Sequence, residues 1–290
     1  YWCGSSKNRD RNLKTRLFWC AIVTSPVALV TGAARGIGLA ITQSLIAAGY
    51  RVMAADLGTD QAWNYQLGQS ADIAQALQAA NPSTDNAPPY AVCTVDVTNA
   101  EACEQAVQKT IETFGQLNLL VNNAGIVDSG PITAFSEAAW DRIFAVNTKG
   151  IFLMSKAAIP HLLVADNASI VNTASIAGKK GVSNMAAYCG SKFAAIGITQ
   201  SLAQELAQDN IRVNAICPGI VGTAMWLDHL IPKNNATNDT PVDFETQTQQ
   251  LIPMGVAQTA EDMADAVLYL ARAHNVTGIA LTVAGGMEMN

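Results

Sequence analysis

From Val27 to the end of the chain, short apolar runs rich in β-branched residues alternate with longer segments of helical period, and this alternation constrains the fold more than any other feature. Such runs are typical of strands that are buried on both faces of a sheet. Strands that alternate with helices form parallel sheets, because each helix returns the chain across a face of the sheet. The sequence therefore predicts an α/β fold, a single domain over residues 26–290 in which a doubly wound, seven-stranded, mostly parallel sheet carries helices on both faces.

The alternation predicts the bounds of each element, and turn-forming residues predict two loops, Asn81–Pro89 and Ile231–Glu245. The expected strands are Val27–Thr31, Arg51–Ala55, Ala91–Asp96, Leu119–Asn122, Ala168–Thr173, Arg212–Ile216 and Ile279–Val283. The expected helices are Ile37–Ala48, Gln61–Ala79, Glu101–Phe114, Glu137–Leu163, Ala186–Gln208 and Ala260–Arg272.

The composition of the 290-residue chain limits the partners that it can have. Hydrophobic residues make up 50% of the chain and charged residues only 14%, which is enough apolar material for one large core. A net charge of -6 argues against binding to nucleic acid or to an anionic membrane, so we expect a small-molecule substrate. Six cysteines without C-x-x-C spacing and three scattered histidines indicate reduced thiols in a cytoplasmic protein and no metal site.

The first residues differ from the rest of the chain. Residues 1–16 carry five basic side chains and one acid, and the 18-residue stretch Leu17–Ala34 that follows is uncharged, which satisfies the length of a membrane span. Polar residues and a proline at 24–26 interrupt this stretch, and its second half fits a strand better. A secretory signal stays an alternative, although no small-x-small cleavage site follows Leu17–Val23. We expect residues 1–25 to be a tail outside the fold, either disordered or added to the natural chain.

A glycine-rich turn joins the first expected strand to the first expected helix. In Thr31-Gly-Ala-Ala-Arg-Gly-Ile-Gly38, the glycines at 32, 36 and 38 would permit a tight turn and a close approach of a pyrophosphate. The helix that starts near Ile37 offers N–H groups and the positive end of its dipole. Taken alone, the pattern fits a plain structural turn equally well.

An acid at the end of the second strand strengthens the dinucleotide hypothesis. Asp56 lies 24 residues after Gly32, where a carboxylate can accept hydrogen bonds from an adenosine ribose. The same carboxylate would repel the 2′-phosphate of NADP, so the sequence favours NAD. Arg35 places a cation in the turn and keeps NADP as the weaker alternative, and Asp56 could also be an ordinary strand-end residue.

Four polar residues are candidates for catalysis. Tyr188 and Lys192 stand at i and i+4 on one face of a weakly charged helix, where the pair could also be a plain surface contact. Moving a phenol from a pKa of about 10 toward 7 takes about 4 kcal/mol, which a unit charge at ~4 Å supplies in an effective dielectric of ~20. Ser175 follows an expected strand at its carboxyl end and is a catalytic or a turn serine. Asn147 lies in a largely apolar helix, as a satisfied core residue or as one that holds an irregular turn and a water.

Taken together, these residues resemble the single-domain branch of the short-chain dehydrogenase/reductase family, with a match from Val27 to Asn290. The resemblance implies a catalytic tetrad of Asn147, Ser175, Tyr188 and Lys192. The cofactor-binding residues that it implies are Gly32, Arg35, Gly36, Ile37, Gly38, Asp56, Asp96, Val97, Asn123, Ala124, Gly125, Tyr188, Lys192, Pro218, Gly219, Val221 and Thr223.

The resemblance also implies the role of each tetrad residue. Tyr188 exchanges a proton with the substrate oxygen while a hydride moves between the carbinol carbon and the nicotinamide, and Ser175 holds that oxygen. Lys192 depresses the tyrosine pKa and binds the nicotinamide ribose, and Asn147 positions a water that links Lys192 to solvent. Family members are commonly tetramers, so a homo-oligomer is expected.

A narrower similarity concerns the substrate. The segment Cys217–Trp226 and the ending Gly285–Asn290 look most like acetoin/diacetyl reductases, butanediol dehydrogenases and some polyol dehydrogenases. The expected function is the NAD(H)-dependent interconversion of a small secondary alcohol and a ketone of diketone, hydroxyketone or polyol type. The alternatives are a non-catalytic dinucleotide-binding regulator, an NADPH-dependent reductase of a larger carbonyl compound, and a sugar-nucleotide epimerase or dehydratase.

The segment after the sixth strand predicts a cover for the site. Residues 224–255 leave the carboxyl end of that strand and include a long polar stretch, which is typical of a mobile lid. Met225 and Trp226 would form an apolar wall beside the nicotinamide. The alternative is a surface insertion without ligand contacts.

Overall fold

The computed structural model describes residues 25–58, 63, 67, 70–80, 88–230 and 243–289. Almost all of the expected tail 1–25, most of the loop Asn81–Pro89 and most of the polar segment Ile231–Glu245 lie outside the described residues.

Within the described residues, seven strands form one sheet in the order β3-β2-β1-β4-β5-β6-β7, and every neighbouring pair is parallel. The strands are β1 (Val27–Thr31), β2 (Arg51–Asp56), β3 (Tyr90–Thr94), β4 (Leu119–Asn122), β5 (Ser169–Thr173), β6 (Arg212–Pro218) and β7 (Ala280–Val283). The order reverses between β1 and β4, which is where ligands bind in open parallel sheets, outside the carboxyl ends of the strands. The predicted doubly wound α/β fold is confirmed.

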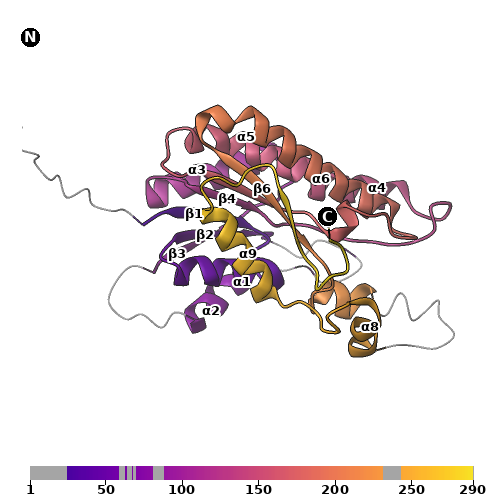
Figure 1. The fold of residues 1–290 in the computed structure, drawn as a ribbon. Coiled ribbons are helices and arrows are strands. Elements are labelled where there is room, and N and C mark those ends of the chain that lie inside the picture. The colour runs from indigo at the N-terminus through magenta and orange to yellow at the C-terminus, as the bar shows by residue number, and fades with distance from the viewer. Residues whose placement is uncertain are drawn as a thin grey trace, which may run out of the picture.

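Helices cover both faces of this sheet (Figure 1). On one face lie α1 (Gly36–Ala47), α2 (Ser70–Ala80) and α9 (Ala260–Arg272), and on the other α3 (Ala100–Phe114), α5 (Gly150–Leu162) and α6 (Ala186–Glu205). Shorter elements are α4 (Glu137–Phe144), η1 (Ala145–Lys149), η2 (Ile176–Gly178), η3 (Ala207–Asp209), η4 (Met225–Leu230) and α8 (Phe244–Leu251). In Figure 1, α4 and α8 lie toward the end of the molecule opposite the one at which the chain enters β1.

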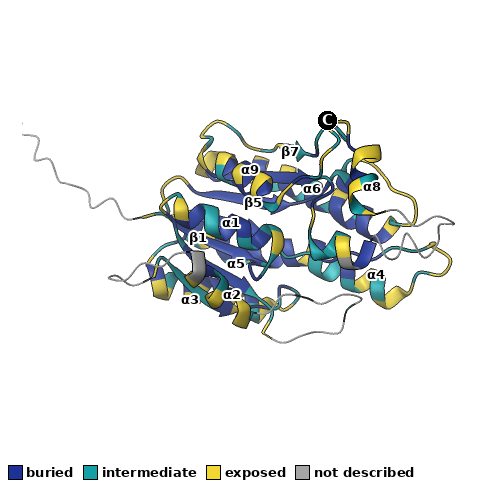
Figure 2. Ribbon diagram, turned by 90° about the horizontal axis from the view of Figure 1, so that it is seen from below, coloured by how far each residue is buried: buried dark blue, intermediate teal, exposed yellow. Residues whose placement is uncertain are grey.

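The core consists of two apolar layers, one on each side of the sheet. Successive side chains of a strand point to opposite faces, so Val30 and Val121 pack under α1 and α9 while Leu29 and Leu120 pack under α3 and α5. All four are fully buried, and the strands form the dark blue centre of Figure 2. Burying such a side chain stabilises the fold by about 1.5–3 kcal/mol.

One predicted helix is wrong in its detail. The sequence predicts a continuous helix over Glu137–Leu163, but the structure divides this segment into α4, the π-helical turn η1 and α5. The wider turn contains Asn147, whose side chain bonds to the backbone of Ile126 instead of facing a regular helix. Apolar periodicity carries no sign of this turn.

Two further differences concern polar segments. The described α2 begins at Ser70, whereas the predicted helix starts at Gln61, and most of residues 59–69 lie outside the described part of the chain. Helix α8 occupies Phe244–Leu251, at the edge of a segment predicted as a loop. Its apolar pattern is weak, and its clearest signal is Asp243, whose carboxylate caps the helix by accepting from the backbone N–H of Thr246 at 2.8 Å.

Candidate functional site

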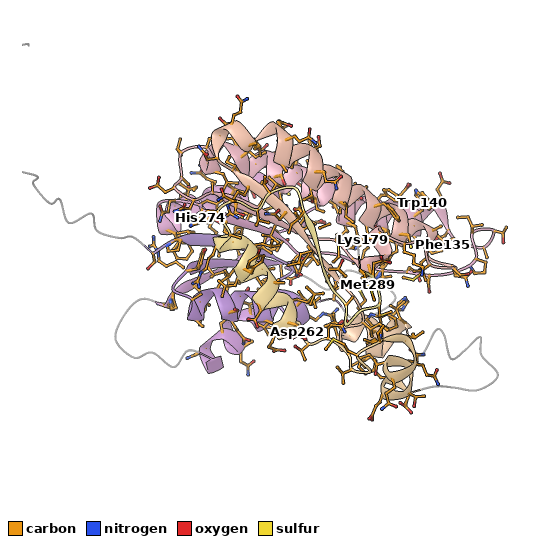
Figure 3. All side chains as sticks on the ribbon, viewed as in Figure 1. Phe135, Trp140, Lys179, Asp262, His274 and Met289 are labelled. Atoms are coloured by element: carbon orange, nitrogen blue, oxygen red, sulfur yellow. The ribbon has the colours of Figure 1, made fainter. Side chains whose placement is uncertain are left out.

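A cavity of about 470 Å³ lies at the carboxyl ends of the strands, at the point where the strand order reverses. It is lined by all of the residues expected to bind a cofactor, namely Gly32, Arg35, Gly36, Ile37, Gly38, Asp56, Asp96, Val97, Asn123, Ala124, Gly125, Tyr188, Lys192, Pro218, Gly219, Val221 and Thr223. Lys179 and Met289, labelled in Figure 3, lie toward this end of the sheet, whereas His274, which follows α9, lies toward the opposite end.

The glycine turn forms one wall of the cavity, and the backbone leaves no room for side chains there. Gly32 has a φ of +67°, and a Cβ on it would lie 2.9 Å from the Cα of Ala124. A Cβ on Gly38 would overlap the carbonyl oxygen of Gly32. Because the start of α1 also lines the cavity, its first N–H groups can bind a phosphate. The cradle therefore fits a dinucleotide.

An asparagine ties this turn to the neighbouring strands. Asn123 follows β4, and its Nδ2 donates to the carbonyl oxygens of Thr31 and Gly32, each at 3.1 Å. Its Oδ1 accepts from the hydroxyl of Thr173 at 3.3 Å. The ends of β1, β4 and β5 are thus tied together by one side chain.

Carboxylates stand at the ends of β2 and β3. Asp56 Oδ2 accepts from the N–H of Ala34 and Oδ1 from the N–H of Leu57, both at 2.8 Å. Burial raises the pKa of Asp56, against the lowering effect of these hydrogen bonds and of the nearby Arg35. Asp96 Oδ1 accepts from the N–H and the hydroxyl of Thr98 at 2.9 and 2.7 Å. Both acids border the cavity on the side of the glycine turn.

Lys192 lines the cavity but is buried, with only 4% of its surface exposed. Its Nζ donates to the carbonyl oxygen of Thr173 at 2.7 Å and lies 5.7 Å from the centroid of the Tyr188 ring. Burial lowers the pKa of Lys192 to about 8, while the nearby thiol of Cys217 acts in the opposite direction. A cation is therefore held close to a tyrosine that lines the same cavity.

Ser175 begins the turn η2, just past β5. Its backbone is extended, and its hydroxyl oxygen accepts from the N–H of Ala177 at 3.1 Å. Its own N–H donates to the thiol of Cys217, at the end of β6. Ser175 lines the cavity together with Tyr188 and Lys192, so the structure brings these three predicted residues together.

Asn147 is the exception, because it does not line the cavity and is only 1% exposed. Its amide exchanges two 2.9 Å hydrogen bonds with the backbone of Ile126 and donates to the hydroxyl of Ser191 at 3.0 Å. It lies close to Lys192, since a Cβ placed on Gly125 would be 3.4 Å from both Asn147 Oδ1 and Lys192 Nζ. Asn147 is thus a satisfied core residue that also holds an irregular helical turn.

The wall beyond Ser175 and Tyr188 is apolar. Met225 and Trp226, which were expected to form a wall beside the nicotinamide, line this part of the cavity. Leu230 and Leu251, within the segment expected to cover the site, also line it, and the residues that the sequence analysis missed here are Val127, Ile176, Ala177, Val182, Met185 and Met287. They come from separate segments with no shared motif, so only the folded topology brings them together. Arg142 of α4 also reaches the cavity and was not predicted.

A buried pair behind this wall joins two segments that border the cavity. Nε2 of His229, in η4, lies 3.4 Å from Oδ1 of Asp128, which follows β4. Both residues are buried, and neither lines the cavity. The pair therefore links η4 to the loop after β4.

Two further observations concern the described part of the chain. None of its helices combines the length and the apolar character that crossing a membrane requires. It also brings no three His, Cys, Asp or Glu side chains together where they could hold a metal ion.

Comparisons with known proteins agree with this geometry. The sequence profile of short chain dehydrogenases matches residues 26–230. The chain is 37% identical to (+)-borneol dehydrogenase 2 of Salvia officinalis, over 90% of this chain and 88% of the relative. It is 34% identical to L-2,3-butanediol dehydrogenase of Corynebacterium glutamicum, over 92% of this chain and 100% of the relative.

A solved structure is similar throughout. The crystal structure of carveol dehydrogenase from Mycobacterium avium in complex with NAD matches with a TM-score of 0.84 at 30% identity, over 91% of this chain and 98% of that one. The strand order and the position of the glycine turn come from the structure of this chain and do not depend on these matches. The chain belongs to the short chain dehydrogenase family, as its sequence predicted.

Proposed function

We propose that this protein is an NAD(H)-dependent oxidoreductase that interconverts a small secondary alcohol and the corresponding ketone. The observation that carries the proposal is the placement of Tyr188 above the buried Lys192, with Ser175 in the same cavity and the glycine cradle beside them. A phenol that lies close to a buried cation can exchange a proton near neutral pH. The intact group disfavours a regulator that only binds a dinucleotide.

The cofactor proposal depends on the residues around the cradle. The backbone at Gly32 and Gly38 and the first turn of α1 would hold the pyrophosphate, and Asp56 would accept from the adenosine ribose. When bound, the nicotinamide supplies or accepts the hydride. The carboxylate of Asp56 would repel an added 2′-phosphate, so NAD is favoured over NADP, although Arg35 borders the same part of the cavity.

The proposed chemistry of the chain is a proton transfer at the substrate oxygen. In the reductive direction the Tyr188 hydroxyl donates its proton to the ketone oxygen, and in the oxidative direction the phenolate removes the proton from the alcohol. The hydroxyl of Ser175 donates a hydrogen bond to the same oxygen and orients it. Lys192 stabilises the phenolate by its charge and would bind the nicotinamide ribose.

Asn147 is proposed to act through the backbone. Its side-chain amide is already bonded to Ile126 and Ser191, so it has little capacity left for a ligand. By holding the π-helical turn open, it would leave space near Lys192 for a water that carries protons to solvent. That role makes Asn147 a positioning residue.

Substrate choice, cover and assembly complete the proposal. Relatives are named for borneol, an apolar alcohol, and for 2,3-butanediol, a polar one, so both classes are candidates. Elements η4 and α8 would cover the bound substrate.

We expect a cytoplasmic homo-oligomer. Exposed rings such as Phe152 of α5 and Phe193 of α6 would be buried between its subunits. Light scattering would measure the mass of the assembly.

The experiment that tests the function is a set of initial rates with NADH and NADPH. Ketones, diketones, hydroxyketones and their alcohols are compared at equal concentration. The proposal predicts reduction of at least one ketone, faster with NADH than with NADPH. Tight binding of NADH without turnover of any compound would favour a non-catalytic regulator instead.

A further inference from the structure

We infer that the substrate is a compact apolar alcohol or ketone with a single oxygen, rather than a diol, hydroxyketone or polyol. The inference rests on the proposed function and deepens it, because it names the class of compound that the substrate half of the cavity takes. It departs from the diketone, hydroxyketone or polyol class that the sequence similarity favours.

The chemistry of the cavity wall carries the argument. Beyond Ser175 and Tyr188, its described lining consists mainly of aliphatic, thioether and indole side chains. These are Val127, Ile176, Ala177, Val182, Met185, Met225, Trp226, Leu230, Leu251 and Met287. The acids of the cavity, Asp56 and Asp96, stand instead at the ends of β2 and β3, where a dinucleotide would bind. Among the described residues of this wall, Ser175 and Tyr188 offer hydroxyls for one oxygen at the reacting carbon, and the charged Arg142 reaches the cavity from α4.

Charged groups near this wall are engaged with other residues. The guanidinium of Arg142 lies 5.7 Å from the centroid of the Trp63 ring, and the indole N–H of Trp63 donates to the carbonyl of Val127 at 3.2 Å. His229 and Asp128 face each other across 3.4 Å behind the wall, and neither lines the cavity. Arg142 thus packs against Trp63, while His229 and Asp128 lie outside the cavity lining, so a second hydroxyl on the substrate would meet mainly apolar side chains.

An unpaired hydroxyl in such a site lowers binding, because it loses its hydrogen bonds to water and gains none from the protein. The loss is about tenfold or more for each hydroxyl. A methyl group in the same position is removed from water instead, and this burial is favourable. The wall should therefore discriminate between two substrates that differ only by a methyl and a hydroxyl.

The shape of the wall favours a bulky substrate over a linear one. Met185, Met225 and Met287 approach from three separate segments, and their unbranched side chains adapt to irregular apolar surfaces. Trp226 adds a broad flat ring to the same wall. A branched or cyclic ketone fills such a space better than a short chain, and Trp226 limits how far it can extend.

Pairs of ketones matched in size test the inference. The first pair is 3-methyl-2-butanone and 3-hydroxy-2-butanone, and the second is 4-methylcyclohexanone and 4-hydroxycyclohexanone. With the wild-type protein and saturating NADH, we expect kcat/KM to be about tenfold or more higher for the methyl member of each pair. Equal or higher kcat/KM for the hydroxyl member of both pairs would overturn the inference and leave the proposed function standing. If all four ketones fail while another compound of the wider panel is reduced, the inference falls and the proposed function stands.

A conservative change of the wall provides a second test. Val182 lines the cavity and is 47% exposed, so Val182→Thr supplies a hydroxyl at nearly constant volume with little risk to folding. In this variant we expect the ratio of kcat/KM for the methyl member to that for the hydroxyl member of each pair to fall several-fold. Val164→Thr is the matched control, because Val164 is 87% exposed and does not line the cavity. An equal effect of the two substitutions, or no effect of Val182→Thr on the ratio, would contradict the role given to the wall.

Discussion

The Nζ atom of Lys192 lies 5.7 Å from the centroid of the Tyr188 ring and is held there by a 2.7 Å hydrogen bond to the carbonyl oxygen of Thr173. Thr173 ends β5, two residues before Ser175, so one strand end positions both the lysine and the serine. A cation held close to the ring favours a negative charge on the phenol oxygen. The pair is thus suited to proton transfer near neutral pH.

Burial of this lysine predicts a pH-dependent cost in stability. The folded-state pKa of about 8 lies below the ordinary value of 10.5. The charged lysine therefore destabilises the ligand-free protein fully below pH 8, and the cost falls as pH rises from 8 to 10.5 because the unfolded chain then binds more protons. The full cost is about 3 kcal/mol.

Urea unfolding of the wild-type protein and of Lys192→Met measures this cost. The free energy of unfolding of the variant, minus that of the wild type, should be constant below pH 8 and should shrink at higher pH. Titrations shared by both proteins cancel in the difference. A difference that stays constant across the alkaline range would show that Lys192 does not carry the depressed pKa.

Asp56 should make NADH the better cofactor. Replacing it in Asp56→Ser removes the charge that repels a 2′-phosphate, so the ratio of kcat/KM for NADH to that for NADPH should fall by about tenfold or more. Asp265→Ser, on the exposed side of α9, is a control that removes a charge from a residue that does not line the cavity. The assignment fails if the wild type uses NADPH as well as NADH.

Trp226 should limit the size of the substrate. Trp226→Ala opens the apolar wall, so kcat/KM for a bicyclic ketone should rise relative to that for 2-butanone. Leu227→Ala is the neighbouring control, since Leu227 is 44% exposed and does not line the cavity. An unchanged kcat/KM ratio in Trp226→Ala would contradict the role of Trp226 in the wall.

Hydrogen exchange in η4 and α8 should also slow when cofactor and substrate bind. Unchanged hydrogen exchange would contradict the proposal that η4 and α8 cover the substrate.

The fold and most of the residues that line the candidate site could be predicted because their signals are local. A buried strand such as β1 is a continuous apolar run, and the cradle needs glycine at positions such as Gly32, where the backbone has a positive φ. Tyr188 and Lys192 are separated by one helical turn, so their proximity also follows from the sequence.

The rest depends on contacts between distant segments. The irregular turn at Asn147 exists because its side chain meets Ile126, which lies on another element. Helix α8 has a weak apolar pattern and was not among the predicted helices. Val182, Leu251 and Met287 reach one wall from three parts of the chain, and no periodicity in the sequence relates them.

The most direct test of the account is the turnover of Tyr188→Phe beside its affinity for NADH. The substitution removes one hydroxyl and keeps the ring, so the protein should fold and bind NADH with a Kd close to that of the wild type. Loss of the proton donor should lower kcat for ketone reduction by about 10²–10⁴-fold. A variant that keeps more than about a tenth of the wild-type kcat would contradict the assignment of Tyr188 as the acid and base of the reaction.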